Sequence, residues 1–200
     1  MTGLRRLTFV IGAIALAAGL GGASPVGKDD MTLGDPRAKV TVIEYASLSC
    51  PHCAHFNNEV FPAFRKKYID TGKVRFVYRE FLTPPAELAA LGALTARCAG
   101  PKNYFKVIDV FFRGQAEIYR TGKARDVILR AGKAAGLNEK KVNACLADKA
   151  AQDALDARVK RWIEEDKIDS TPTLVINGKV LEGAHTIEAL DAAIQPLLAR

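Results

Sequence analysis

The chain has 200 residues, of which 48% are hydrophobic and 26% are charged, and this composition is typical of a globular protein with one core rather than a disordered or fibrous chain. The formal net charge of +7 is a mild excess, and acidic and basic residues are mixed along the sequence. Mixed charges of this kind are typical of solvated helix surfaces, so we expect no nucleic-acid partner.

The first 23 residues have the pattern of a secretory signal sequence. Arg5 and Arg6 precede a mainly apolar run from Leu7 to Leu20, and small residues follow at 21–24. The alternative is an uncleaved membrane anchor, but this run is shorter than the roughly 20 residues that span a bilayer. We therefore expect cleavage after Ala23 and export to the periplasm, where disulfides can form and persist.

The mature chain begins with a turn-rich lead-in segment, residues 24–38. A mostly apolar, β-branched run at 40–45 then predicts a strand covered on both faces. Aromatic and aliphatic residues recur at intervals of four from Phe56 to Tyr68 and predict a helix, which Pro62 should kink by removing one backbone donor. A second strand is predicted at 74–78. Four or five helical segments follow, at 86–99, 103–115, 124–135, 138–147 and 151–168.

Strand character returns near the C-terminus. The run 173–176 is followed by Asn177-Gly178, a strong hairpin signal because both central positions of a type I′ turn favour positive φ, and then by a short strand at 179–181. Thr186 is expected to cap a last helix at 187–198. Strand–helix–strand followed by a hairpin and a helix predicts an α/β protein with a mixed four-stranded sheet and an all-helical insertion after the second strand.

The motif Cys50-Pro51-His52-Cys53 lies where the first strand is followed by a helix. Unpaired N–H groups and the positive end of the helix dipole stabilise a thiolate at that point. Pro51 suits the first helical turn, where its missing donor would have no partner. His52 stabilises the Cys50 sulfur further if it is protonated or donates a hydrogen bond. We therefore expect an exposed Cys50 with a lowered pKa and a buried Cys53.

A lowered Cys50 pKa sets the direction of the reaction. A pKa of roughly 4 instead of the usual 8.5 would stabilise the dithiol near pH 7 by ~4 kcal/mol, equivalent to about 90 mV. Because a stabilised dithiol makes its disulfide a stronger oxidant, we expect the Cys50–Cys53 disulfide to be donated to substrate thiols through a mixed disulfide at Cys50.

Two other interpretations of this pair remain open. Half of a zinc site would need a second closely spaced ligand pair, but Cys98 and Cys145 are isolated and His55 supplies only one further ligand. A purely structural disulfide across two residues would stabilise little, because the loop it closes is so short. We favour redox chemistry, and expect no metal and no cofactor besides the redox-active disulfide.

With this motif the chain resembles the DsbA-like family of periplasmic thiol:disulfide oxidoreductases, within the thioredoxin superfamily. The resemblance covers nearly the whole mature chain, from Val42-Ile43-Glu44-Tyr45 through the cysteine motif and the helices to Thr171-Pro172-Thr173. It implies a thioredoxin-like domain formed by 39–83 and 168–200, an inserted helical domain at 84–167, and a nucleophilic Cys50. It also implies reoxidation by a quinone-linked membrane partner resembling DsbB.

The resemblance assigns roles to three further residues. Pro172 matches the cis-proline that faces the cysteines in thioredoxin-like proteins, the alternative being a trans proline at the start of an ordinary strand. A cis bond would leave the backbone of Thr171 free to pair with an extended substrate. Glu44 matches the buried acid that serves as a proton acceptor near Cys53, the alternative being an acid that reaches solvent at the strand end.

Thr171 also leaves the direction of the reaction open. DsbA-like oxidases often have an aliphatic residue there, whereas disulfide isomerases similar to DsbC and DsbG have threonine. The segment between Ala23 and Val40 is too short for a dimerisation domain, which disfavours an isomerase and favours a monomer. The leading function is therefore an oxidase of reduced or unfolded exported proteins. The alternatives are an isomerase or reductase, or a non-catalytic chaperone or binding module.

Cys98 and Cys145 lie in the predicted helical insertion. In an oxidising compartment we expect them to form a structural disulfide, with free buried thiols as the alternative. Closing this loop would contribute roughly 4 kcal/mol in the chain-entropy model.

Overall fold

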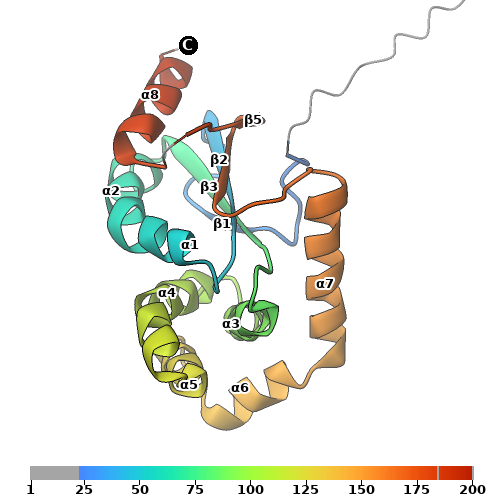
Figure 1. Cartoon of the computed structure of the whole chain (residues 1–200). Helices are drawn as coiled ribbons and strands as arrows, with labels where there is room; N and C mark the ends of the chain where they lie inside the picture. Colours follow the sequence, from blue (N-terminus) through green and yellow to red (C-terminus); the bar gives the residue numbers. More distant parts are fainter. Residues whose placement is uncertain (1–22, 184, 200) are drawn as a thin grey trace, which may run out of the picture.

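The computed structural model describes residues 23–183 and 185–199, so the predicted signal sequence lies outside the described residues except for Ala23 (Figure 1). The described chain forms a five-stranded mixed sheet with the strand order β1-β3-β2-β4-β5. Strand β2 pairs in parallel with β3, and the other pairs are antiparallel. The strands are β1 (Met31–Leu33), β2 (Val40–Ala46), β3 (Val74–Glu80), β4 (Thr173–Ile176) and β5 (Lys179–Val180).

The predicted α/β fold with a mixed sheet is confirmed, but the sheet has one strand more than predicted. Strand β1 lies in the segment expected to be only a turn-rich lead-in, and it pairs with the outer edge of β3. A three-residue edge strand is too short to show the alternation by which strands are found in a sequence. This strand attaches the lead-in segment to the sheet.

The helix that follows β2 is not regular. It runs as α1 (Pro51–His55), a π-helical turn η1 (Phe56–Val60), α2 (Phe61–Phe64) and a second π-helical turn η2 (Arg65–Ile69). Pro62 lies in α2, between the two wide turns. Prolines and π-helical turns are both recognised causes of helix kinks, so the irregularity falls where a kink was predicted.

Five helices lie between β3 and β4 in the described chain: α3 (Ala86–Cys98), α4 (Tyr104–Thr121), α5 (Ala124–Ala134), α6 (Glu139–Leu146) and α7 (Lys149–Glu164). Their number and order agree with the predicted helical segments, but two predicted ends were wrong. Helix α4 extends past residue 115 to Gly122, whose φ of 73° ends it, and α7 ends before residue 168. The longer α4 brings its last turns to the cysteine motif.

The C-terminal elements follow the local sequence signals. Asn177 and Gly178 have φ values of 45° and 82°, as the type I′ turn requires. Helix α8 (Ile187–Leu198) is capped by the Thr186 hydroxyl, which accepts a hydrogen bond from the backbone N–H of Ala189 at 3.3 Å.

Helices cover both faces of the sheet (Figure 1). On one face, Val42 and Ala46 of β2 belong to the main core, which also includes side chains of α2, α4 and α8. On the other face, Ile43 and Tyr45 pack with Trp162 of α7. The lead-in residues Ala23 and Val26 pack against this second cluster. No described helix is both long enough and apolar enough to span a bilayer.

Candidate active site

Cys50 occupies the N-cap of α1, immediately after the loop that follows β2. Its φ of −82° and ψ of 120° are extended, and Pro51 begins the helical turn. The Cys50 carbonyl accepts the first helical hydrogen bond, from Ala54 N at 3.1 Å. Cys50 and Cys53 are not bonded to each other, so the structure describes the dithiol form. The thiol therefore lies where the unpaired N–H groups of the helix start are available to it.

The expectation that Cys50 is exposed was wrong. Only 7% of Cys50 is exposed, and Cys53 is fully buried. The reason is a distant segment: the Thr171–Pro172 peptide bond is cis, and the Cys50 Sγ donates a hydrogen bond to the Thr171 carbonyl at 3.3 Å. The chain at 171–172 thus covers most of the sulfur.

The surroundings of Cys50 lower its pKa to about 5. The largest cause is a hydrogen bond from the Cys53 thiol, which outweighs the opposing effect of burial. The Thr171 hydroxyl and the backbone N–H groups of Cys53 and His52 add to it. The His52 side chain is exposed, and it is the backbone of His52, not its imidazole, that contributes to the lowered pKa of Cys50.

Two buried groups close to the Cys50 sulfur, the Cys53 thiol and the Glu44 carboxyl, have raised pKa values and keep their protons. Burial is the main reason why the pKa of Cys53 is raised far above its usual range. Burial, together with the charge on Cys50, raises the pKa of Glu44 to about 8. Glu44 is 4% exposed, and its Oε1 has no hydrogen-bond partner in the described chain. It does not reach bulk solvent as an acid at a strand end would, although it borders a cavity of about 380 Å³.

Helix α4 holds the loop that carries Cys50. The buried Gln115 donates from Nε2 to the carbonyls of Leu48 and Cys50, at 2.8 and 3.1 Å. The Tyr119 hydroxyl donates to the Ser49 carbonyl. Sequence reasoning missed both residues, because nothing local marks them. The only available signal was the polar Gln115 at a position that continues the apolar helix face of Ile108 and Phe111.

A groove with a volume of about 440 Å³ opens beside Cys50. It contains all three histidines of the chain, two from the first helix and one from the segment before α8. Its lining is His52, His55, Phe56, Thr171, Pro172, Gly183, His185 and Thr186. One residue of the cysteine motif, His52, therefore lines the same groove as Thr171 and the cis-proline Pro172.

The other two cysteines lie elsewhere. Cys98 at the end of α3 and Cys145 in α6 are joined by a disulfide, with a Cα–Cα distance of 6.0 Å. Within residues 23–183 and 185–199, no three His, Cys, Asp or Glu side chains are grouped in a way that could hold a metal ion.

A mixed sheet with a Cys-x-x-Cys pair at a helix start, opposite a cis-proline, defines the thioredoxin class of dithiol proteins. A family model described as thioredoxin matches residues 27–196. A Rickettsia bellii protein named as a candidate protein-disulfide oxidoreductase is 32% identical over 170 residues, which are 84% of this chain and 64% of that protein.

Two crystal structures share the fold over most of both chains. Alpha-DsbA1 of Wolbachia pipientis has 26% identity and a TM-score of 0.78, with 87% of this chain and 93% of that chain covered. BdbD of Bacillus subtilis has 24% identity and a TM-score of 0.75, with 90% and 98% covered. This chain therefore belongs to the thioredoxin family, in its DsbA-like branch. It spans less than two thirds of its Rickettsia relatives, 64% and 63% for two of them.

Proposed function

We propose that the chain is a thiol:disulfide oxidoreductase that donates its Cys50–Cys53 disulfide to reduced or unfolded exported proteins. The observation that carries this proposal is the opposite shift of the two thiol pKa values. Cys50 titrates at about 5, whereas Cys53 keeps its proton. Compared with a thiol of ordinary pKa, a Cys50 pKa of 5 stabilises the dithiol near pH 7 by about 3 kcal/mol. This raises the reduction potential of the pair by roughly 60 mV.

The reaction proceeds in two exchanges. A substrate thiolate attacks the Cys50 sulfur of the oxidised protein, so that a mixed disulfide forms and the bond to Cys53 breaks. Cys53 leaves as a thiolate and takes up a proton, and the nearby Glu44 carboxyl, protonated up to a pKa of about 8, is the group that can supply it. The second substrate thiolate then attacks the substrate sulfur of the mixed disulfide. The Cys50 thiolate departs, and the two electrons remain in the protein as its dithiol.

The same surroundings provide a place for the substrate backbone. The Thr171 carbonyl, next to Pro172, accepts a hydrogen bond from the Cys50 thiol. An extended peptide that pairs with this short segment would bring its own cysteine close to the Cys50 sulfur. The adjoining groove would receive the neighbouring substrate side chains. Recognition through the backbone fits an enzyme that acts on many unfolded chains.

The proposed setting is the periplasm, reached by means of the signal sequence that ends at Ala23. After each reaction the dithiol must be oxidised again, and we assign this step to a membrane partner that resembles DsbB and passes the electrons to a quinone. The enzyme would work as a monomer and with no cofactor besides its own disulfide.

The deciding experiment measures the Cys50 thiolate and the reduction potential together. Thiolate absorbance, followed in a Cys98→Ala/Cys145→Ala background, should titrate near pH 5. Equilibration with glutathione should give a potential well above the value of about −270 mV typical of thioredoxin. A thiolate pKa near 8 with a thioredoxin-like potential would defeat the oxidase proposal.

Thr171 supports a second candidate, an isomerase or reductase. Its hydroxyl is buried, has no conventional hydrogen-bond partner in the described chain and faces Cys50. An isomerase would rescue a substrate with scrambled disulfides at catalytic concentrations, whereas an oxidase would only form disulfides in reduced substrate. A Cys50→Ser variant separates both from a non-catalytic binding module, because only the module would keep full activity in cells.

A further inference from the structure

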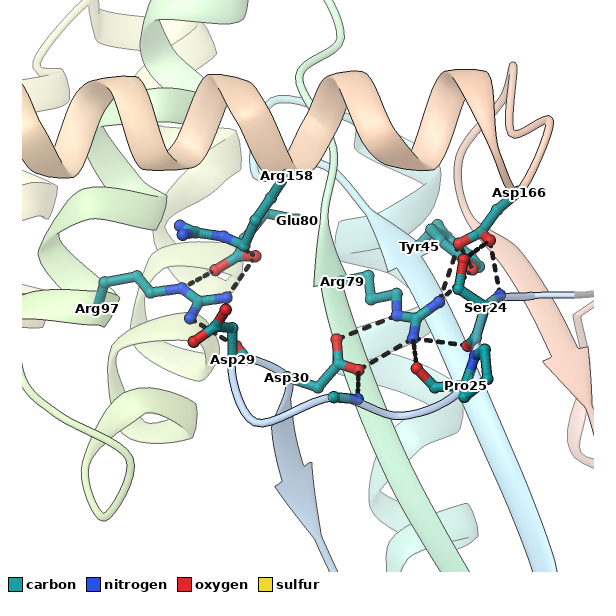
Figure 2. A network of polar contacts seen from close by, with 11 residues as sticks. Ser24, Pro25, Asp29, Asp30, Tyr45, Arg79, Glu80, Arg97, Arg158 and Asp166 are labelled. Atoms are coloured by element: carbon teal, nitrogen blue, oxygen red, sulfur yellow. Dashed lines mark hydrogen bonds and ion pairs between the residues drawn. The ribbon is translucent and has the colours of Figure 1, made fainter.

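A buried polar cluster surrounds the first residue after the expected cleavage point (Figure 2). The backbone N–H of Ser24 donates to Asp166 Oδ1 at 2.6 Å, and the Ser24 hydroxyl donates to the same oxygen. The other oxygen of Asp166 accepts from the Tyr45 hydroxyl at 2.6 Å and from Arg79 Nη1 at 2.9 Å. One buried carboxylate therefore collects donors from the lead-in and from two strands.

The lead-in backbone is held at the same place by Arg79. Its Nη2 donates to the carbonyls of Ser24 and Pro25, at 2.9 and 3.2 Å. The same guanidinium binds the carboxylate of Asp30 and stacks on the ring of Trp162, 4.3 Å from its centroid. Two sets of contacts therefore fix the position of the Ser24 nitrogen. The nitrogen itself donates to Asp166, and Arg79 binds the two backbone carbonyls that follow it.

The charges of this cluster do not balance. The Arg79, Asp30 and Asp166 side chains are 1%, 4% and 1% exposed, so one buried cation faces two buried carboxylates. Tyr45 does not alter the balance, because burial raises its pKa and keeps its hydroxyl neutral. A buried charge without a partner is strongly destabilising. The cluster therefore lacks one positive charge.

Apart from Arg79, no cation of the described chain forms an ion pair with Asp30 or Asp166. In the adjoining cluster, Arg97 and Arg158 both pair with Glu80 instead (Figure 2). Arg97 also donates to the backbone carbonyl of Asp29. Arg161 lies over the Trp162 ring, and within the described residues it forms no ion pair with either carboxylate of the first cluster.

We propose that Asp166, Tyr45 and Arg79 form a binding site for the α-ammonium group of the mature chain. Hydrolysis of the Ala23–Ser24 peptide bond leaves the carboxylate on Ala23, which departs with the signal sequence, and an amine on Ser24, which takes up a proton. The nitrogen that donates to Asp166 as an amide in the precursor then carries the missing positive charge at the same position. We call this place the N-terminal ion site.

The consequence is that removal of the signal sequence stabilises the fold. In the precursor the site keeps its hydrogen bonds but retains one uncompensated carboxylate. In the mature chain the charges match, and Val26 remains packed against the second core cluster. A precursor that folds less stably is also easier to keep unfolded for export.

The test compares three chains that differ only at the N-terminus: one that begins at Ser24, one that begins at Ala23, and one that begins at Nα-acetylated Ser24. An α-amino group ordinarily titrates at about 7.7–8.0. In the Ser24 chain we expect a pKa raised above this range, and acetylation by acetic anhydride at least tenfold slower than in the urea-unfolded chain. The amine of the chain that begins at Ala23 should titrate in the ordinary range.

Urea unfolding of the same three chains provides the stability readout. Below the ordinary α-amino pKa, the unfolding constant of the Ser24 chain should be at least tenfold smaller than that of the acetylated chain. Because the folded-state pKa is raised, this advantage is complete in mildly acidic solution and is lost as the pH rises through the raised pKa. An equal unfolding constant, or an unprotected amine with an ordinary pKa, would overturn the proposal.

Asp166→Asn identifies the partner of the ammonium. Introduced into the Ser24 chain and the acetylated chain, this variant should abolish most of the difference between their unfolding constants. An unchanged difference would contradict the proposal that Asp166 binds the ammonium group. If this variant does not fold, the amine pKa and its acetylation rate in the otherwise unaltered chain decide the question. Mass spectrometry of the chain exported from a bacterial cell should show a start at Ser24, and a different start would also overturn the proposal. None of these readouts depends on redox activity.

Discussion

Glu44 shows how one buried side chain can couple stability to chemistry. Its carboxyl projects from β2 and is buried, and burial is the main reason why its pKa is raised to about 8. In the unfolded chain a glutamate titrates near 4.3, so folding near pH 7 requires this group to take up a proton. The contribution of Glu44 to folding stability is therefore complete below about pH 4, where the acid is neutral in both states. It is lost as the pH rises through 8.

Glu44→Gln should therefore stabilise the protein near neutral pH. The amide is neutral at every pH and needs no proton on folding, so we expect a gain of about 3 kcal/mol near pH 7 and a flatter stability profile between pH 5 and 8. Urea unfolding across this range measures both. Glu59→Gln is the matched control, because Glu59 is exposed, and it should change stability by less than about 0.5 kcal/mol. A destabilised Glu44→Gln protein would contradict this account.

At the residue scale, the sequence predicted what local structure determines. A strand followed by Cys50-Pro51 predicts a thiol at a helix start, and Asn177-Gly178 predicts a tight hairpin, because both depend on neighbouring residues alone. The burial of Cys50 depends instead on a carbonyl 121 residues away. No local pattern contains such a distance, so the sulfur was expected to be exposed.

At the scale of elements, α4 links the helices to the cysteine loop. Gln115→Ala would leave the buried carbonyls of Leu48 and Cys50 without their donor, which should cost about 1–3 kcal/mol. The loosened loop should also raise the Cys50 pKa, seen as slower alkylation in mildly acidic solution. Gln152→Ala is the control: Gln152 donates to the Leu146 carbonyl away from the site, and its loss should leave the thiol unchanged. An unaltered Cys50 pKa in the Gln115 variant would show that α4 does not position the thiol.

The disulfide between α3 and α6 is a separate element of stability. Replacing Cys98 and Cys145 by alanine opens a loop with a sequence separation of 47, and the chain-entropy model gives a loss of roughly 4 kcal/mol. Because the bond joins helices at a distance from Cys50, the thiolate pKa should not move. Thermal unfolding and a thiolate titration of the same double variant measure the two effects. A shifted Cys50 pKa would show that the helices transmit strain to the active site.

The sequence predicted the presence of most helices and strands better than the residues at which they begin and end. The helical patterns after β3 were found because each repeats an apolar face, but α4 continues to Gly122 because its last turns pack and bond against the cysteine loop. Likewise β1 exists because β3 offers it an edge. Both features are tertiary in origin, and so the sequence pattern could not define them.

At the scale of the whole molecule, the oxidation state of the cysteine pair should change the stability of the entire fold. Reduction creates a Cys50 thiolate that the folded chain stabilises, with a pKa of about 5 against an ordinary 8.5. Since the folded pKa is the lower one, this stabilisation is complete above about pH 8.5 and is lost as the pH falls through 5. The disulfide form has no thiolate and gains nothing from it.

The stability of the reduced protein, measured relative to the oxidised protein, should therefore increase by about 2.5 kcal/mol between pH 4.5 and pH 7. Urea unfolding of both forms at each pH gives this difference, and the constant contribution of the short disulfide loop cancels in the comparison. The reduced Cys50→Ala chain is the control, since without a thiolate it should lack this pH dependence. A gap that stays constant with pH would mean that the thiolate is not stabilised by the fold, and the driving force for giving the disulfide away would then be absent.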